Sequence, residues 1–319
     1  MLYVSILAGF VLLFGGGEVL VRGAVTISRR LGLSPLLIGM TVVAGATSAP
    51  ELVVSVDAAL GGSPDIALGN VVGSNIANIL AVVGISALIT PIVVQPKAIR
   101  RDAAAMFAAV LALALVTVTG EVGRVAGVAF LVALIAYLAW SYHLELSDEP
   151  PPSAERHARE GEEFGSAKTM WRAAFQLVGG LGALVVGSRL LVTGATGIAR
   201  DFGISEAVIG LTMVAIGTSL PEIATSVIAA VRKHPDVAVG NVLGSNLFNA
   251  LAIIGITALV QPIAVAEQMA RVDVWVMVGT SAVMVLLLLR GRINRIVGAV
   301  LLAVYAAYVA LLFVGMGAG

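Results

Sequence analysis

The chain has 319 residues, of which 59% are hydrophobic and only 12% charged, and its mean hydropathy is +1.03. Soluble domains carry about 25% charged residues, so this composition excludes an ordinary soluble protein and indicates an integral membrane protein. The net charge of zero argues against a nucleic-acid partner. The lack of cysteine excludes disulfides and thiolate metal sites. The first apolar segment has no basic leader and contains Glu18, so we expect a retained helix rather than a signal peptide.

Ten apolar runs are each long enough, at about 20 residues, to cross a bilayer as a helix. Between the fifth and sixth runs lies a Pro-rich, charged and non-periodic segment, 144–170, which is typical of a flexible linker. We therefore expect an all-α polytopic membrane protein with membrane units at 1–143 and 171–319. The ten runs lie near 2–21, 36–60, 66–89, 102–119, 123–143, 171–195, 205–231, 237–260, 270–289 and 293–315.

Two polar stretches, 45–78 and 217–249, interrupt these apolar runs and are copies of one another. Glu222 follows Glu51 by 171 positions (222 − 51 = 171), and one constant offset over many polar positions indicates an internal duplication. The same offset aligns Pro50 with Pro221, Ser55 with Ser226, Asn70 with Asn241, Ser74 with Ser245 and Asn78 with Asn249.

The duplication gives five helices on each side of the linker, and an odd number forces the second copy to enter the membrane inverted. With the N-terminus outside, the inside loops hold fifteen Lys and Arg residues and the outside loops four. This positive-inside bias predicts both termini outside and a cytoplasmic linker, in a multi-pass protein of the cell (inner) membrane. Inverted repeats of this kind are typical of secondary transporters, whose site lies at the midplane where the repeats meet.

The first copy places a carboxylate and hydroxyls on one face of an apolar helix. Thr47, Ser48 and Ser55 lie at i−4, i−3 and i+4 from Glu51. An intramembrane Glu is costly and marks a functional site by default. Pro50 removes a backbone donor, so we expect the carbonyls freed around positions 44–46 to find other partners or to line a polar cavity. Ser74 and Asn78 form a second i, i+4 pair on the next helix. The second copy supplies Thr218, Ser219, Glu222, Ser226, Ser245 and Asn249, and Pro221 is expected to free carbonyls around 215–217.

The ligand atoms of this set are all oxygens. Ca²⁺ takes six to eight oxygens at flexible distances, whereas zinc and copper favour sulfur or imidazole. The three histidines, His143, His157 and His234, lie at helix ends or in the linker. One Ca²⁺ balances two ionised glutamates, and Na⁺ of similar size suits the same oxygens. An empty site of charge −2 is costly to move across the bilayer, so ion-loaded states should be the mobile ones.

At these residues the sequence resembles the sodium/calcium exchanger family of the cation/calcium exchanger superfamily, in its minimal prokaryotic form. The resemblance covers essentially the whole chain and implies ten helices in two inverted halves. It implies that Glu51 and Glu222 bind Ca²⁺ and share that role with Na⁺, and that Thr47 and Thr218 add Ca²⁺ oxygens. It also assigns Ser48, Ser74, Ser219 and Ser245, with the Ala44 and Ala215 carbonyls, to flanking Na⁺ positions, and Asn78 and Asn249 to the middle of the site.

One departure concerns coupling. Archaeal relatives carry Asp where this chain has Asn249, so a third negative charge is absent. We expect an antiporter, not an enzyme, that exchanges Na⁺ for Ca²⁺ by alternating access, with spans one and six sliding past a fixed core. Ca²⁺/H⁺ exchange and K⁺-dependent Na⁺/Ca²⁺ exchange remain open; the duplicated hydroxyls favour Na⁺ over H⁺. An intramembrane hydrolase or a passive channel fits the duplicated ligands less well. We expect the lipid bilayer and the transported cations as partners, with no organic cofactor and no obligatory protein partner.

Overall fold

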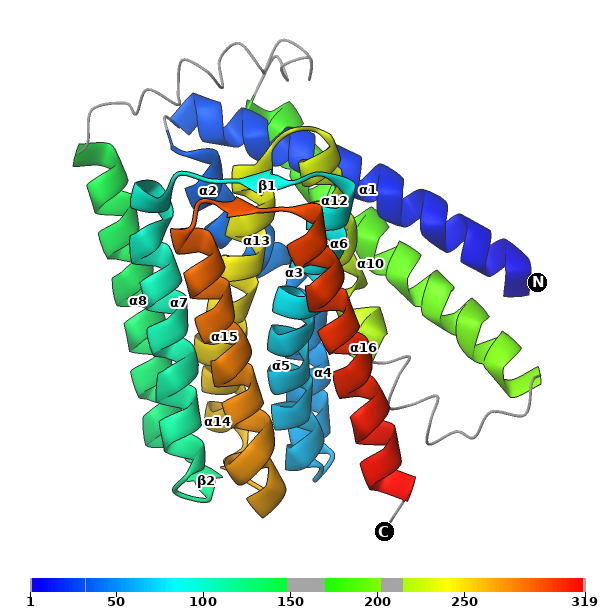
Figure 1. The fold of residues 1–319 in the computed structure, drawn as a ribbon, viewed down its shortest axis with the longest axis vertical. Coiled ribbons are helices and arrows are strands. Elements are labelled where there is room, and N and C mark those ends of the chain that lie inside the picture. Colours follow the sequence, from blue (N-terminus) through cyan, green and yellow to red (C-terminus); the bar gives the residue numbers. More distant parts are fainter. Residues whose placement is uncertain (1, 32, 148–169, 202–214, 318–319) are drawn as a thin grey trace.

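The computed structural model describes residues 2–31, 33–147, 170–201 and 215–317, and nearly all of them are helical (Figure 1). Residues 148–169 of the expected linker 144–170, and the first part of the expected seventh span, lie outside the described residues; the linker's two ends belong to α8 and α10. The first half contains α1 (Leu2–Leu31), α2 (Pro35–Ile38), η1 (Gly39–Val43), α3 (Ala44–Thr47), α4 (Ala49–Leu60), α5 (Pro64–Ala77), η2 (Asn78–Val82), α6 (Val83–Ile89), β1 (Ile92–Val93), α7 (Pro96–Thr117), β2 (Glu121–Val122) and α8 (Arg124–Ser147).

The second half follows a similar order, with the single helix α12 described where the first half has the broken segment α2–α4, and with the additional turn η6. It contains α10 (Met170–Asp201), α12 (Ala215–Val231), α13 (Pro235–Phe248), η5 (Asn249–Ile253), α14 (Ile254–Val260), β3 (Ile263–Ala264), η6 (Met269–Asp273), α15 (Val274–Leu289), β4 (Arg292–Ile293) and α16 (Arg295–Gly317).

The two halves are copies in structure as well as in sequence. The starts of α5 and α13 differ by 171 positions (235 − 64), as do those of η2 and η5 (249 − 78) and of β1 and β3 (263 − 92). The short strands pair across the halves: β1 is antiparallel to β4, and β2 to β3. Such a reciprocal exchange is what a two-fold relation between copies produces, so the duplication organises the whole fold.

Among the described residues, six helices are long and apolar enough to cross a membrane, or seven if the bent pair Pro35–Thr47 and Ala49–Leu60 is one span. The sequence predicted ten. The three remaining expected spans are α7, whose first turns carry Arg100, Arg101 and Asp102, α16, and the seventh. The seventh expected span is described only from Ala215 onward.

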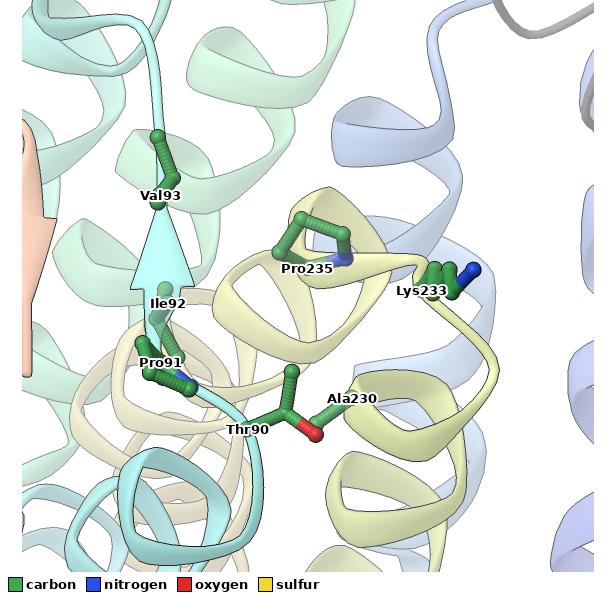
Figure 2. A pocket seen from close by; sticks show the side chains of 7 residues that line it. All are labelled: Thr90, Pro91, Ile92, Val93, Ala230, Lys233 and Pro235. Atoms are coloured by element: carbon green, nitrogen blue, oxygen red, sulfur yellow. The ribbon is translucent and has the colours of Figure 1, made fainter. Parts of the chain in front are cut away.

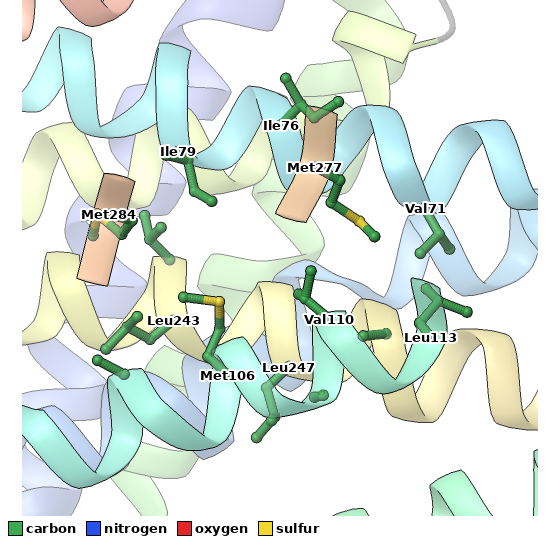
Figure 3. Packing of buried hydrophobic residues seen from close by; sticks show 14 of the residues in the cluster. Val71, Ile76, Ile79, Met106, Val110, Leu113, Leu243, Leu247, Met277 and Met284 are labelled. Carbon is green, nitrogen blue, oxygen red and sulfur yellow. The ribbon is translucent and has the colours of Figure 1, made fainter. Parts of the chain in front are cut away.

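The core of the molecule is formed by the helices that carry the duplicated polar stretches. The spans Pro64–Ile89 and Pro235–Val260 are 78% and 83% buried, whereas the span at Arg124–Glu145 is 22% buried. Figure 3 shows Met106 and Val110 of α7 packing beside Leu243 and Leu247 of α13 and Met277 of α15. The outward faces carry large exposed apolar side chains, which suits contact with lipid rather than water.

Helices α1 and α10 lie side by side along one flank (Figure 1). Their backbones approach closely: a Cβ added to Gly16 would lie 2.9 Å from the Gly180 carbonyl oxygen, so only glycine fits. Glu18 on α1 forms ion pairs with Arg22 at 2.7 Å and with Arg232 after α12 at 2.8 Å. The α1–α10 pair therefore packs closely and contacts the rest of the protein through apolar side chains, such as Leu20 beside Ala224, as well as through these ion pairs.

Candidate ion-binding site

The first copy of the motif lies at a break between two helices. Helix α3 ends at Thr47, Ser48 adopts φ −81° and ψ 2°, and α4 begins at Ala49 with Pro50 as its second residue. Proline has no N–H to continue the helical ladder, and the segments on either side are bent by 43°. Glu51 consequently lies in the first turn of α4, where the positive end of the helix dipole favours a carboxylate.

The second copy differs, because Pro221 lies inside the continuous helix α12. The carbonyl four residues before this proline, that of Gly217, accepts a hydrogen bond from Ser188 Oγ of α10. In the first copy, the Ala44 carbonyl accepts from the Ser48 N–H at 2.9 Å and from Thr47 Oγ1 at 3.3 Å. Both carbonyls therefore have intramolecular partners, which is one of the two outcomes that the sequence predicted for carbonyls released by the prolines.

The sequence-predicted site residues lie in the buried core of the protein. Their exposed fractions run from 0% to 7%. Ala215 is the first residue of α12, and its side chain is outside the described part of the chain. The buried members are Ala44, Thr47, Ser48, Glu51, Ser74, Asn78, Thr218, Ser219, Glu222, Ser245 and Asn249.

Contacts across the duplication bring the two sets together. Ser48 Oγ of the first copy donates to Glu222 Oε1 of the second at 3.5 Å. Thr47 Oγ1 donates to Asn241 Oδ1 at 3.2 Å. Glu51 follows Ser48 by three residues on the same chain segment, so the Ser48–Glu222 contact brings both carboxylates into one region. The structure thus joins both carboxylates in one buried polar region formed by both halves.

Several oxygens in this region have no hydrogen-bond partner among the described residues. A buried polar atom left without a partner costs about 1–3 kcal/mol, so such a cluster requires an explanation. Its members belong to carboxylate, amide and hydroxyl groups, which are ligands of hard cations. They are Glu51 Oε2, Asn78 Oδ1, Ser219 Oγ, Glu222 Oε2, Ser245 Oγ and Asn249 Oδ1.

The helical backbone is irregular at Asn78 and at Asn249. The π-helical turns η2 and η5 begin at Asn78 and Asn249, and π-bulges inside α-helices occur frequently at functional sites. Within the described residues, no three His, Cys, Asp or Glu side chains gather as a metal-binding group. The oxygens of this region therefore come from two carboxylates together with neutral hydroxyls and amides.

Sequence reasoning missed a set of supporting asparagines. Asn70 Nδ2 donates to the Glu51 carbonyl at 3.1 Å and to Ser55 Oγ at 3.0 Å. Its copy, Asn241, donates to Ser226 Oγ at 3.0 Å. Asn75 and Asn246 cross between the halves and contact the amides of Asn249 and Asn78. The 171-residue offset relates these asparagines too, so the repeat contained the signal that could have identified them.

A separate cavity of about 190 Å³ lies between β1 and the turn that joins α12 to α13 (Figure 2). Its lining contains one charged side chain, which is cationic, and no carboxylate, so it does not suit a cation. The lining residues are Thr90, Pro91, Ile92, Val93, Ala230, Lys233 and Pro235.

The fold and the duplicated buried oxygens define a multi-pass membrane protein with a candidate cation site, an arrangement typical of secondary transporters. The model of the sodium/calcium exchanger protein family matches residues 1–143 and 172–314. The chain therefore belongs to the sodium/calcium exchanger family, and it is a transporter rather than an enzyme.

Known relatives match the chain over nearly its whole length. The putative antiporter CaxA of Alkalimonas amylolytica is 39% identical, with 97% of this chain and 98% of the relative covered. The sodium/calcium exchanger MaX1 of Methanosarcina acetivorans is 32% identical, with 98% of each covered. A solved structure of the sodium-calcium exchanger NCX_Mj, soaked with Na⁺ and Ca²⁺, superposes with a TM-score of 0.82 at 32% identity and covers 97% of each chain.

Proposed function

We propose that this protein exchanges Na⁺ for Ca²⁺ across the membrane through a single site that opens to either side in turn. The observation that carries the proposal is the cluster of buried, unpartnered oxygens contributed by both copies around Glu51 and Glu222. Two ionised carboxylates balance one Ca²⁺, and neutral hydroxyls and amides complete a shell of the size that Ca²⁺ prefers. The names of the relatives MaX1 and NCX_Mj agree with these ions.

Within this site, we assign the central Ca²⁺ position to the Glu51 and Glu222 carboxylates with oxygens from Thr47 and Thr218. Asn78 and Asn249 contribute amide oxygens in the middle. The remaining ligands serve flanking Na⁺ positions; they are Ser48, Ser74, Ser219 and Ser245 with the Ala44 and Ala215 carbonyls. The Ala44 carbonyl already accepts two hydrogen bonds. A Na⁺ bound at this carbonyl would therefore displace the Thr47 hydroxyl, which would then turn toward the cation.

The proposed architecture is ten membrane helices in two inverted five-helix repeats, 1–143 and 171–319, joined by a cytoplasmic linker at 144–170. Fifteen basic residues in one set of loops against four in the other support an orientation with both termini outside the cell membrane. The crosswise pairing of β1 with β4 and of β2 with β3 is consistent with this two-fold arrangement.

Alternating access in this scheme moves α1 and α10 together past the core. They meet through glycines without an intervening side chain, so they can slide as one body. Their contact with the site is direct, since Ser188 of α10 bonds to the Gly217 carbonyl beside Thr218. An empty site with two uncompensated carboxylates resists this movement, whereas a loaded site does not, and such a difference couples the two ion fluxes.

The test is ⁴⁵Ca²⁺ uptake into proteoliposomes loaded with Na⁺ and diluted into Na⁺-free medium. We expect uptake that depends on the Na⁺ gradient and disappears in Glu51→Gln. Uptake no greater than that of vesicles without internal Na⁺ would refute Na⁺ coupling. A pH gradient in Na⁺-free medium, and added K⁺, distinguish the Ca²⁺/H⁺ and K⁺-dependent alternatives.

A further inference from the structure

Four asparagines cross at the centre of the molecule, two from each copy. Asn75 and Asn78 lie at the end of α5 and the start of η2, and Asn246 and Asn249 lie at the corresponding places in α13 and η5. All four side chains are no more than 1% exposed. With water excluded, each amide must satisfy its donor and acceptor ends within the protein or with a bound ion.

Backbone carbonyls fix the orientation of the first two amides. Asn75 Nδ2 donates to the Asn246 carbonyl at 3.4 Å, and Asn246 Nδ2 donates to the Asn75 carbonyl at 3.4 Å. A carbonyl can only accept, so each amide must turn its NH₂ group toward the other backbone. Asn75 Nδ2 also lies 3.4 Å from Met277 Sδ, which is again an acceptor. The oxygens of Asn75 and Asn246 are thereby directed away from these carbonyls.

Those two oxygens in turn fix the orientation of the other pair. Asn249 Nδ2 donates to Asn75 Oδ1 at 3.0 Å, and Asn78 Nδ2 donates to Asn246 Oδ1 at 3.1 Å. Each of these amides uses its NH₂ group on the neighbouring oxygen. The Oδ1 atoms of Asn78 and Asn249 therefore remain available, and neither has a hydrogen-bond partner among the described residues.

We propose that Asn75 and Asn246 are positioning residues that keep the amide oxygens of Asn249 and Asn78, rather than their NH₂ groups, facing the transported cation. The inference rests on the proposed function and extends it to two residues that contact no ion. A reversed Asn249 would place two oxygens against each other at Asn75 and would present N–H donors to a cation. In each half, one asparagine thus determines which end of the opposite half's amide side chain faces the cation.

The test uses the fact that a carboxylate needs no such orientation, because both of its ends are oxygens. We expect Asn75→Ala to raise the KM for Ca²⁺ about tenfold, the equivalent of one hydrogen bond lost at the ligand. In an Asn249→Asp background, where a carboxylate oxygen already faces Asn75 Oδ1, the same change should leave KM unchanged or lower it. In an Asn78→Asp background, where Asn249 is still an amide, the full effect should remain, so the paired backgrounds form a double-mutant cycle.

The reciprocal variants give an independent set: Asn246→Ala should be rescued by Asn78→Asp and not by Asn249→Asp. Calcium-dependent thermal stabilisation of the purified protein provides a second readout that does not depend on turnover. If Asn75→Ala does not fold, Asn75→Ser removes the acceptor that faces Asn249 while keeping a small polar group.

The outcomes separate the two proposals. A parent chain that shows neither Na⁺-driven Ca²⁺ flux nor stabilisation by Ca²⁺ overturns the proposed function. A parent that transports, with an Asn75→Ala effect that is absent or is equal in both aspartate backgrounds, overturns only the positioning role. An equal effect in both backgrounds is what a purely structural role of Asn75 would give.

Discussion

Replacing Glu222 with Gln removes one charge from the candidate site while keeping the shape of the side chain, and it should move two measured quantities in opposite directions. Glu222 is 1% exposed, its Oε2 has no partner in the described part of the chain, and its Oε1 accepts a hydrogen bond from Ser48 of the first copy. Without an ion, the substitution removes a buried charge that no cation balances, and an unpaired charge is costlier to bury than a neutral amide. We therefore expect the ion-free protein to gain about 1–3 kcal/mol of stability.

The same substitution should lower the affinity for Ca²⁺. Removing one partner from a buried ion pair costs about 3–5 kcal/mol, and 1.4 kcal/mol corresponds to a tenfold change in affinity. We therefore expect the Ca²⁺ affinity to fall at least about 100-fold and Na⁺-driven uptake to become undetectable at Ca²⁺ concentrations that saturate the parent.

Thermal unfolding of the purified protein, with and without Ca²⁺, measures both effects. The expected pattern is a raised ion-free melting temperature together with loss of the Ca²⁺-induced increase. The matched control is Glu121→Gln, at an exposed position on β2, which should leave both quantities unchanged. If Glu222→Gln lowered the ion-free melting temperature and kept the Ca²⁺-induced increase, the reasoning from buried charge would be wrong.

Two further substitutions test the contacts of the α1–α10 pair. Gly16→Ala should destabilise the protein by about 1–3 kcal/mol and reduce transport, because the added methyl group meets a backbone carbonyl of α10 at 2.9 Å; Gly15→Ala, which meets nothing within 4 Å, is the control for thermal unfolding and uptake. Ser188→Ala should cost about 1–3 kcal/mol by leaving the Gly217 carbonyl without a partner. Adding Pro221→Ala restores an N–H for that carbonyl, and an unchanged deficit in the double variant would contradict this explanation.

Much of the candidate site could be predicted because the relevant signals are local and are repeated. A glutamate in an apolar run, with hydroxyls at i−4, i−3 and i+4, places a polar stripe on one helix face whatever the rest of the chain does. The second copy at the same offset made accidental occurrence implausible, and the family match agrees with the resemblance drawn from those residues. The predicted number of spans and the roles of individual ligands stay predictions.

Other features could not be read from the pattern, since they depend on what packs against each segment. Pro50 lies in the first turn of a new helix, whereas its copy Pro221 lies inside a continuous one, although the two motifs align. The Gly217 carbonyl accepts a hydrogen bond from Ser188 on α10. The first half has Gly17 at the position that corresponds to Ser188 (188 − 171 = 17), so it has no hydroxyl there. Identical motifs therefore adopt different local structures because their neighbours differ.

The amino-acid sequence by itself determined that this chain belongs in a membrane, that it is a duplication, and which oxygen-bearing side chains face away from lipid, because hydropathy and helical periodicity act within each segment. The tertiary structure alone decided how the copies interlock: the crosswise strand pairs, the Ser48–Glu222 contact and the direction of each asparagine amide. These features depend on contacts between residues some 170 positions apart, where the geometry of two packed helices, rather than any local pattern, selects which donor meets which acceptor.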